Sequence, residues 1–440
     1  MMSKQINRGI VWFCLGCLIL ASLAITIPTA SAKLQRAGIA TGTARNAAIV
    51  ATTEAVLKET SDLRELAILK DVKSGAQSRA EIERMLIRNM DEESTPAELH
   101  AAEMALKVFG LAPADFQYRP FLIKLLTEQV AGYYDPKVQQ FYLADWIELE
   151  GQKPVMAHEL THALQDQHFN LRRFEKWPKG DSDAELAAHA LIEGDATLAM
   201  TLYMAKHPLV ALAFIRSLGS DNTASEQFKQ APRAIRESLM FPYEQGSAWA
   251  TQLYRRDGWQ VVSKAFTKLP LSTEQILHTD KYVQYEAPVK VTIPELSTAL
   301  GPGWKRIESD VNGEWGYYLI LDEYLNNEEE SKQASEGWGG DRFVIYEGTK
   351  PGEVFLAQVT AWDTESDAKE FFAAYAKRTA ARYTDAKTAT QMPATTATGE
   401  RQEWATASGS VLVERRGQRV WIMEGIPTAA KSKALSNLLW

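Results

Sequence analysis

The sequence predicts an α+β protein: a mainly helical first part with a small antiparallel sheet, followed by a smaller α+β domain. Apolar residues recur at helical spacing over much of residues 63–277, and within that stretch only residues 128–145 have the character of strands. After about residue 285, short strand-like runs alternate with helix-like stretches. The 440 residues exceed one ordinary core of roughly 150 residues. We therefore expect one domain at residues 33–284 and a second at residues 285–440.

Composition and charge are those of an ordinary globular protein. Hydrophobic residues make up 45% of the chain and charged residues 24%, which argues against both disorder and a polytopic membrane protein. The net charge is −8, so the chain lacks the basic excess that neutralises phosphates. Nucleic acid is therefore not expected as a partner.

The N-terminus has the pattern of an export signal. Lys4 and Arg8 precede a nearly unbroken apolar run from Ile10 to Ile27, and the small residues Ala-Ser-Ala follow at positions 30–32. We expect residues 1–32 to be a cleaved signal peptide and the protein to be exported, periplasmic or extracellular. The alternative is a retained membrane anchor with the rest of the chain outside, because about 18 apolar residues reach the lower limit for crossing a bilayer.

Both cysteines of the chain, Cys14 and Cys17, lie inside this apolar run. The cleaved protein would therefore contain no thiol, so a metal site must use histidine and carboxylate ligands. Lipidation of Cys17 is a weaker alternative, because residue 14 is a cysteine where a leucine-like residue is expected.

The first helices are predicted from spacing and capping residues. Residues 33–60, rich in Ala and Thr, suit a flexible or helical arm with little function of its own. Residues 63–87 suit a helical hairpin with a turn at Ser74-Gly75. The next helix should begin after the N-cap Thr95 and end near Gly110.

A β-hairpin and several long helices follow. Aromatic and β-branched residues on both sides of Asp135-Pro136 predict a hairpin over residues 128–145. Helical periodicity then covers residues 155–169 and 183–204, and further helices are expected over residues 232–277.

The C-terminal part should contain strands at residues 342–347, 354–362, 408–414 and 420–424, and helices at residues 366–380 and 428–439. A hairpin followed by a helix thus occurs twice, which indicates a loose internal repeat. The glycines of residues 337–340 are expected to shape a turn, because no helix pattern follows that would suit a phosphate-binding loop.

The string Ala157-His158-Glu159-Leu160-Thr161-His162 carries the most specific pattern in the chain. Two histidines four residues apart lie on one face of a helix, so both imidazoles can reach a single tetrahedral Zn²⁺. Glu159 is offset by about 100° around the helix, which lets its carboxylate face the open metal position and act on water as general base. The alternative is a helix whose histidines border a polar groove.

A third ligand should come from the helix at residues 183–204. Glu185, His189 and Glu193 are spaced four apart and share one face of that helix. Glu193 is preferred, partly because the adjacent Gly194 would allow close approach to the metal helix. His189 and Glu185 remain alternatives.

With these residues the chain resembles the gluzincin group of zinc metallopeptidases, in which a glutamate on a downstream helix completes the His-Glu-x-x-His site. The specific match covers residues 132–195, with weaker similarity on to His278. The resemblance implies a zincin-like domain at residues 33–284, with His158, His162 and Glu193 as ligands and Glu159 as base. The Asn-Glu-x-x-x-Asp string of thermolysin-like members and the extended metzincin string are both absent. The sequence is thus more similar to uncharacterised secreted bacterial zincins.

Several supporting roles are expected around this site. Asp166 and Asp195 are candidates to accept a hydrogen bond from a ligand histidine, whereas His168 should be structural. The resemblance implies an edge strand that pairs with extended substrate, a role open to residues 132–134; core packing of Tyr133 and Tyr134 is the alternative.

Tyr243 and His278 are candidate donors to the oxyanion that develops on an attacked carbonyl, with simple structural roles as the alternative. The function expected from the sequence is an exported zinc endopeptidase that acts on protein or peptide substrates. Two other functions remain open: a non-catalytic zinc-containing binding protein, and a zinc hydrolase acting on a cell-wall amide or an ester. Oligomeric state cannot be predicted from these patterns.

Overall fold

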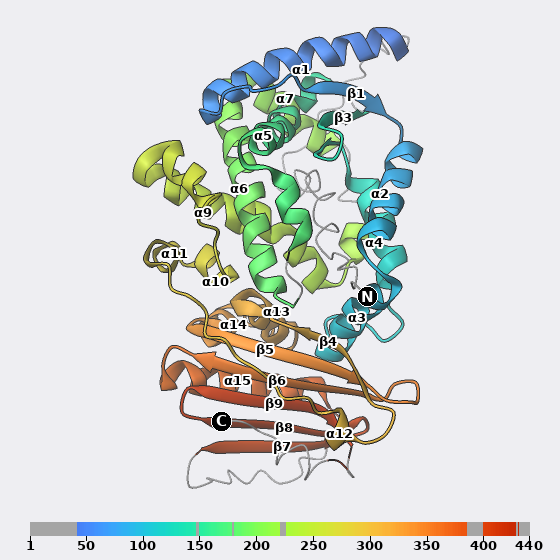
Figure 1. Cartoon of the computed structure of the whole chain (residues 1–440), viewed down its shortest axis with the longest axis vertical. Coiled ribbons are helices and arrows are strands. Elements are labelled where there is room, and N and C mark those ends of the chain that lie inside the picture. The colour runs from blue at the N-terminus through green and yellow to red at the C-terminus, as the bar shows by residue number, and fades with distance from the viewer. Residues whose placement is uncertain are drawn as a thin grey trace, which may run out of the picture.

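A computed structural model of the chain describes residues 42–146, 149–177, 180–220, 226–384, 399–427 and 430. Within these ranges the protein has the predicted α+β fold, with a small three-stranded sheet among helices and a six-stranded antiparallel sheet toward the C-terminus (Figure 1). The expected signal peptide at residues 1–32 and nearly all of the expected helix at 428–439 lie outside the described residues.

The first part is mainly helical. Its helices are α1 (Gly42–Arg64), α2 (Arg79–Glu93), α3 (Pro96–Phe109), α4 (Tyr118–Gln129), α5 (Lys153–Phe169), α6 (Ser182–Lys206), α7 (Pro208–Ser220), α8 (Glu226–Gln230), α9 (Arg233–Ala265), α10 (Thr273–Leu277) and α11 (Thr279–Gln284). The helix predicted after Thr95 is confirmed as α3: Thr95 and Glu98 form a reciprocal capping box, and Gly110 ends the helix in the left-handed region at φ 78°.

The predicted hairpin is confirmed, but the sheet it belongs to is mixed. Strands β2 (Gly132–Asp135) and β3 (Gln140–Ala144) pair antiparallel, and β1 (Lys73–Gln77) pairs with β3 in parallel. The order β1-β3-β2 leaves β2 at one edge of this sheet.

The helical hairpin predicted at residues 63–87 is wrong. α1 ends at Arg64, and Ser74-Gly75, expected as a turn, lies inside β1. Backbone hydrogen bonds to β3 outweigh the weak strand preference of a segment without β-branched or aromatic residues.

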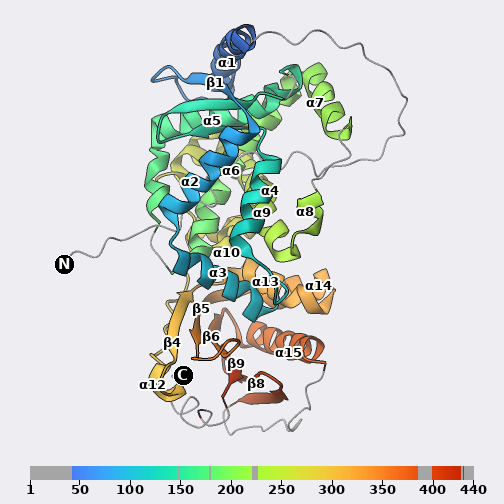
Figure 2. The same ribbon diagram turned by 90° about the vertical axis from the view of Figure 1, so that its right-hand side faces the viewer.

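Helices α5, α6 and α9 form the framework of the first part. α6 and α9 pack along most of their length around a core that includes Leu191, Trp249 and Leu253, all fully buried. α1, at the top of Figures 1 and 2, packs across α5 through Ile49, Val56 and neighbouring apolar residues. The arm expected at residues 33–60 is therefore, from Gly42 onward, a helix that packs one side against the hydrophobic core.

The C-terminal sheet has the strand order β4-β5-β6-β9-β8-β7. Its strands are β4 (Lys305–Asp310), β5 (Trp338–Glu347), β6 (Val354–Trp362), β7 (Glu400–Thr406), β8 (Gly409–Arg416) and β9 (Arg419–Ile426). Two antiparallel three-stranded units, β4-β5-β6 and β9-β8-β7, meet where β6 pairs with β9. Of the predicted repeat, both hairpins are present as β5-β6 and β8-β9, and α15 follows the first; the helix expected after the second lies almost wholly outside the described residues. Of the glycines expected to form a turn, Gly337 precedes β5 with φ 78°, whereas Gly339 and Gly340 lie within that strand.

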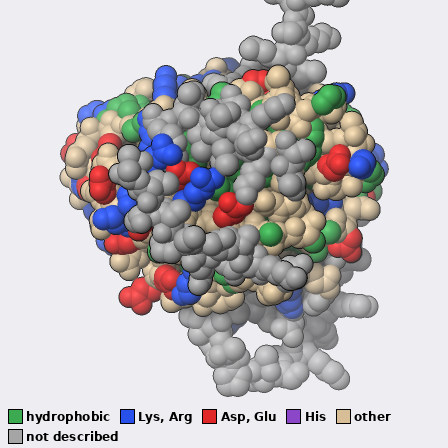
Figure 3. All heavy atoms as spheres, turned by 90° about the horizontal axis from the view of Figure 1, so that it is seen from below, with side chains coloured by type: hydrophobic (Ala, Val, Ile, Leu, Met, Phe, Trp, Pro, Cys, Tyr) green, Lys and Arg blue, Asp and Glu red, His purple; other side chains and the backbone are tan. Residues whose placement is uncertain are grey.

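The two faces of the six-stranded sheet are covered differently. Helices α13 (Gly313–Leu325), α14 (Glu328–Ser335) and α15 (Glu365–Arg382) pack on one face, together with Phe109 of α3. The segment from Val291 to α12 (Ser297–Leu300) packs on the other face. At the end of the molecule seen in Figure 3, Lys and Arg side chains are interspersed with Asp and Glu among the described atoms.

Buried carboxylates hold the N-terminus of α6 on both sides. Asp183 accepts hydrogen bonds from the backbone and hydroxyl of Thr273 in α10. Asp310 of β4, in the C-terminal part, accepts from the backbone and hydroxyl of Ser182. Among the described residues, no single helix has the length and hydropathy for crossing a bilayer; α6 and the first part of α7 satisfy both together, as a pair bent by 113°.

Candidate metal centre

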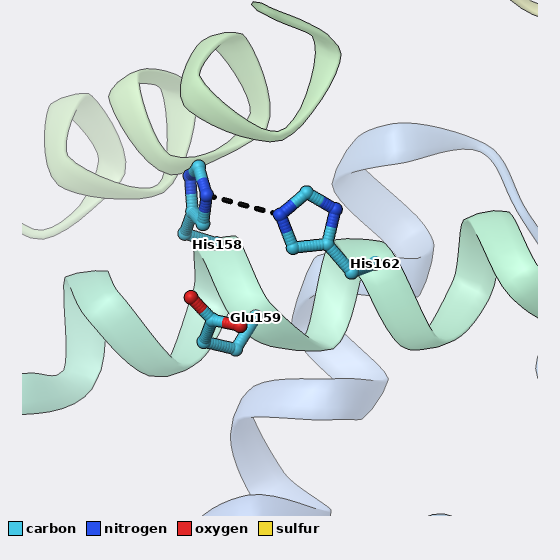
Figure 4. Close-up of side chains that lie close together, drawn as sticks. All are labelled: His158, Glu159 and His162. Atoms are coloured by element: carbon cyan, nitrogen blue, oxygen red, sulfur yellow. Dashed lines mark hydrogen bonds between the residues drawn. The ribbon is translucent and has the colours of Figure 1, made fainter. Parts of the chain in front are cut away.

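The two histidines of the His-Glu-x-x-His pattern project from α5 into the protein interior. His158 is 4% exposed and His162 6% exposed, and the residues beside them on the helix, Ala157, Leu160 and Ala163, are fully buried. Figure 4 shows both rings on one side of the helix, with the carboxylate of Glu159 nearby. The four-residue spacing therefore places the imidazoles one turn apart, and the apolar residues around them exclude water.

Glu193 of α6 meets both imidazoles. Its Oε2 lies 3.1 Å from His158 Nε2 and 3.3 Å from His162 Nε2, and the two Nε2 atoms are 3.1 Å apart. Three potential ligand atoms from two helices thus form a nearly equilateral triangle in a buried site.

The size of this triangle fits a zinc ion. With zinc–ligand distances of about 2.0–2.1 Å and tetrahedral angles, two ligand atoms are expected about 3.3 Å apart. The three observed separations lie close to this value. The set of two imidazoles and one carboxylate is also a donor combination of catalytic zinc sites, which keep one further position open.

Glu159 lies beside the triangle and is held by the edge strand. The ligand atoms of His158, Glu159 and His162 lie within 4.8 Å of one another. Glu159 is 1% exposed, and its Oε2 accepts a hydrogen bond of 2.9 Å from the backbone N–H of Tyr134 in β2. The hairpin before α5 therefore fixes the direction of this carboxylate.

A chain of buried polar groups orients His162. Its Nδ1 lies 2.8 Å from Gln165 Oε1, and Gln165 Nε2 donates to Ile192 O at 3.0 Å and to Asp195 Oδ2 at 2.8 Å. Because two acceptors hold the amide nitrogen, the amide oxygen must face the imidazole. His162 Nδ1 is then the donor, so in the neutral ring Nε2 carries the lone pair that faces His158 and Glu193.

Arg64 completes this chain. Its Nε donates to Asp195 Oδ1 at 2.5 Å, its Nη1 donates to Ser263 Oγ at 3.1 Å, and its guanidinium lies 4.3 Å from the ring centroid of Trp259. Arg64 and Asp195 are both fully buried, so each supplies the charge that the other needs.

The electrostatics of the cluster favour a bound cation. Burial opposes the charged form of Glu193, but His162 and His158 outweigh it and hold the pKa of this carboxyl well below its usual range. Burial likewise opposes charge on His162, yet Glu193 raises the pKa of this imidazole to about 9. Without a metal, a proton therefore takes the place of the positive charge at this position.

Close packing of α6 and α9 brings Glu193 to this position. A Cβ atom on Gly194 would lie 2.2 Å from the backbone of Gly246, and one on Gly246 would lie 2.2 Å from Ala190 O. Only glycine at both positions permits this approach. Gly194 therefore allows α6 to pack on α9, rather than on the metal helix as expected.

The other two ligand candidates on α6 are also buried. His189 is 3% exposed, and burial lowers its pKa to about 4. Glu185 lines a cavity one turn further toward the start of α6. Of the three candidates, Glu193 is the one whose carboxylate oxygen is recorded within 3.1–3.3 Å of both imidazoles.

The structure separates the two predicted oxyanion donors. Tyr243 of α9 stacks on His158, with ring centroids 6.1 Å apart, which places it at the cluster. His278 instead lies 2.9 Å from Glu314 Oε1 of α13. Among the described residues, no recorded contact joins His278 to the triangle.

Asp166 and His168 have partners outside the metal cluster. Asp166 accepts from the hydroxyl of Tyr134 at 3.0 Å and from the backbone N–H of Leu171 at 2.9 Å, so it anchors the C-terminal end of α5. His168 Nε2 contacts Ala67 O at 2.7 Å. Asp195 is the one of the two aspartates that acts toward a ligand histidine, and it does so through Gln165.

Residues 300–436 match a family described as a domain of unknown function (DUF8575). The match covers all six strands of the C-terminal sheet and none of the residues of the candidate metal cluster. No curated protein and no solved structure matches the chain.

Proposed function

We propose that this protein is an exported zinc-dependent peptidase that hydrolyses peptide bonds in protein or peptide substrates. The observation that carries the proposal is the buried triangle of His158, His162 and Glu193, with separations of 3.1–3.3 Å, beside the carboxylate of Glu159. A purely structural zinc site has no need of this extra carboxylate. We further propose residues 33–284 as the catalytic domain and residues 285–440 as a second domain that supports it.

His158, His162 and Glu193 would hold the ion, which when bound supplies Lewis-acid activation of the carbonyl and of water. Glu159 takes a proton from the attacking water and passes it to the leaving amine nitrogen. The N–H of Tyr134 keeps this carboxylate in place during both transfers. Because water attacks directly, no covalent bond to the chain forms.

Two further groups support substrate binding. Strand β2 lies at the edge of its sheet and touches Glu159, so an extended peptide that pairs with β2 would pass the catalytic base. Tyr133 and Tyr134 are themselves buried, 6% and 4% exposed, so we assign recognition to the strand backbone. Tyr243, stacked on His158, is proposed to donate its hydroxyl to the developing oxyanion.

The test is to measure zinc content and casein hydrolysis for the purified protein, Glu159→Gln and the exposed control Glu83→Gln. One zinc per chain in all three proteins, with hydrolysis lost only in Glu159→Gln, supports the proposal. Zinc without casein hydrolysis in any of them favours a binding protein or a different bond, which a panel of cell-wall amides and esters would identify. Absence of zinc in the wild type would refute the site.

A further inference from the structure

Helix α7 presents an apolar face to solvent. Leu209 is 81% exposed, Leu212 42% and Ile215 57%. These positions are three residues apart, so they form one stripe along the helix. On the opposite side Phe214 is buried, and Val210 packs against the core between α1 and α5. The helix therefore has one apolar side in the core and a second apolar side in contact with solvent.

Exposed apolar side chains are concentrated in this helix. Ten large hydrophobic residues are exposed in the described part of the chain, and three of them lie within residues 209–215. No other stretch of seven described residues contains more than two. Single exposed apolar residues are ordinary on a protein surface, whereas a contiguous patch indicates contact with an apolar partner.

The charges beside this stripe are basic. Residues 196–220 include no Asp or Glu. Arg216 is exposed, and its position on the helix places it on the same face as Leu209 and Leu212. Lys206, just before α7, pairs with Glu59 while much of its side chain stays exposed. An exposed apolar helix face bordered by basic side chains is typical of helices that lie in a membrane interface and contact anionic headgroups.

The geometry of α7 suits a position in the interface but not a crossing. Its 13 residues extend for about 20 Å, whereas the hydrocarbon core of a bilayer is about 30 Å thick. Helix α6 would supply the missing hydropathy, but it is bent by 113° relative to α7, and its last turns pack into the core through buried residues such as Leu198, Met200 and Tyr203. Lipid contact is therefore confined to the outward face of α7.

The stripe is small for a protein partner. A standard interface involves about 20–30 residues on each side, and a second copy of this chain would have to supply and meet a surface of that size. The outward face of α7 offers three large apolar side chains with Arg216 beside them. A few apolar side chains combined with a basic group are, by contrast, sufficient for reversible binding to a membrane surface.

The place of α7 in the molecule agrees with this partner. α7 lies at the same end as α1 (Figures 1 and 2). In the sequence, α1 is preceded by the apolar run Ile10–Ile27, with residues 28–41 between them. If that run is retained as an anchor, it holds this end of the protein close to a bilayer. α7 also lies against the short helix η2 (Glu150–Gln152) and against α5, the helix that carries both histidines of the candidate site.

We propose that the outward face of α7 inserts into the interface of a lipid bilayer that carries anionic headgroups. Leu209, Leu212 and Ile215 enter the boundary between headgroups and acyl chains, and Arg216 contacts lipid phosphates. Because α7 lies against the start of α5, this binding places the metal helix beside the bilayer surface. The proposal does not depend on hydrolytic activity.

The test places a reporter within the stripe of the full chain. Cys14 and Cys17 are changed to Ala, and Leu212→Cys is labelled with a polarity-sensitive fluorophore, so the signal comes from α7 even if residues 1–32 are retained. Val283→Cys, at a half-exposed valine of α11, is the matched control. Both proteins are titrated with vesicles of equal parts phosphatidylcholine and phosphatidylglycerol, with and without spin-labelled lipid as quencher.

We expect vesicles to shift the emission of the label at residue 212 to shorter wavelength and spin-labelled lipid to quench it, while the label at residue 283 responds to neither. Adding Leu209→Glu and Ile215→Glu should abolish the response, and the control pair Val283→Glu and Val289→Glu should preserve it. Equal behaviour of the two labels, or a response that survives Leu209→Glu and Ile215→Glu, would overturn the proposal. A shift that grows with protein concentration in the absence of vesicles would overturn it in favour of a second copy.

The role of charge is tested separately. Arg216→Gln should weaken the apparent affinity for these vesicles by about fivefold, because one basic side chain near an anionic surface contributes roughly that factor. Arg256→Gln, at an exposed position of α9, should leave the affinity unchanged. Equal affinities of the two variants would contradict the contact with anionic headgroups. Since none of these measurements uses casein hydrolysis, their failure and the failure of the proposed function are distinguishable.

Discussion

Arg64 and Asp195, 131 residues apart in the sequence, form an ion pair with a distance of 2.5 Å and no exposure of either side chain. Asp195 also accepts from Gln165, which in turn accepts from His162. The last residue of α1 therefore lies at the far end of a hydrogen-bonded chain that begins at a proposed metal ligand.

We expect Arg64→Met to destabilise the protein by about 3–5 kcal/mol, because it leaves Asp195 buried without a counter-charge. Urea unfolding measures this change, and Arg256→Met, at an exposed site on α9, should have little effect. The double variant Arg64→Met/Asp195→Leu should recover part of the loss. A double variant as unstable as the sum of the two single changes would contradict the pairing.

Gln165→Leu should weaken zinc binding by about 10–100-fold, because it removes the acceptor that fixes His162. The expected readout is the zinc dissociation constant from chelator competition, with Gln260→Leu, at an exposed position, as control. An unchanged dissociation constant in a folded Gln165→Leu protein would mean that the amide has no role at the site.

The third ligand can be identified by comparing Glu193→Ala with His189→Ala. Since Oε2 of Glu193 approaches both imidazoles within 3.1–3.3 Å, its removal should abolish stoichiometric zinc binding. His189→Ala should keep one zinc per chain in the same elemental analysis. The reverse result would assign the ligand to His189.

Gly194→Ala should destabilise the protein by about 1–3 kcal/mol or more, since the new methyl group would overlap the backbone of Gly246. Gly75→Ala is the matched control, because its Cβ would meet its nearest neighbour at an ordinary 3.6 Å. Thermal unfolding of both variants measures the difference. Equal stability would show that α6 and α9 can separate at little cost.

His278→Gln should destabilise the protein in a pH-dependent way. The hydrogen bond to Glu314 raises the pKa of His278 above its usual value, so the pair contributes stability at pH values below about 6.5 and loses it as pH rises through the folded-state pKa. The free energy of unfolding of the variant should therefore be lower than that of the wild type at pH 6. At pH 9 the two free energies, measured by urea unfolding, should be closer to each other. A loss of turnover with unchanged stability would instead support a catalytic role.

Local patterns in the sequence were sufficient for much of the fold. The capping residues Thr95 and Gly110 bound α3 where predicted, and the residues around Asp135-Pro136 form the expected hairpin. Strand β1 could not be predicted, because Lys73–Gln77 acquires its conformation from pairing with residues 67 positions later. The sequence analysis likewise did not predict strand β4 or helices α13 and α14.

Some residues of the candidate site could likewise be predicted from the sequence, and others could not. His158, Glu159 and His162 could be predicted from their spacing on one helix, and the four-residue spacing on α6 gave three candidates for the proposed third ligand. The sequence around Gln165 and Arg64 contains no motif that predicts their roles. Both depend on groups of α6 and α9 that come close only in the folded protein. The hydrogen bond from the backbone N–H of Tyr134 to Glu159 could not be predicted either. Nearly every residue type has a backbone N–H, so the sequence does not indicate which one donates.

The groups that hold the cluster in place are also widely separated in the order of synthesis. Arg64 contacts Ser263, 199 residues later, and α5 at residues 153–169 lies between them in the sequence. A ribosome adding about 5–20 residues per second needs roughly 5–20 s to proceed from His162 to Ser263. During that interval the growing chain carries both histidines without the enclosure that orients them. Zinc binding at the proposed site would therefore be a late event in folding, and the proposed hydrolytic activity would arise only when the helical part is nearly complete.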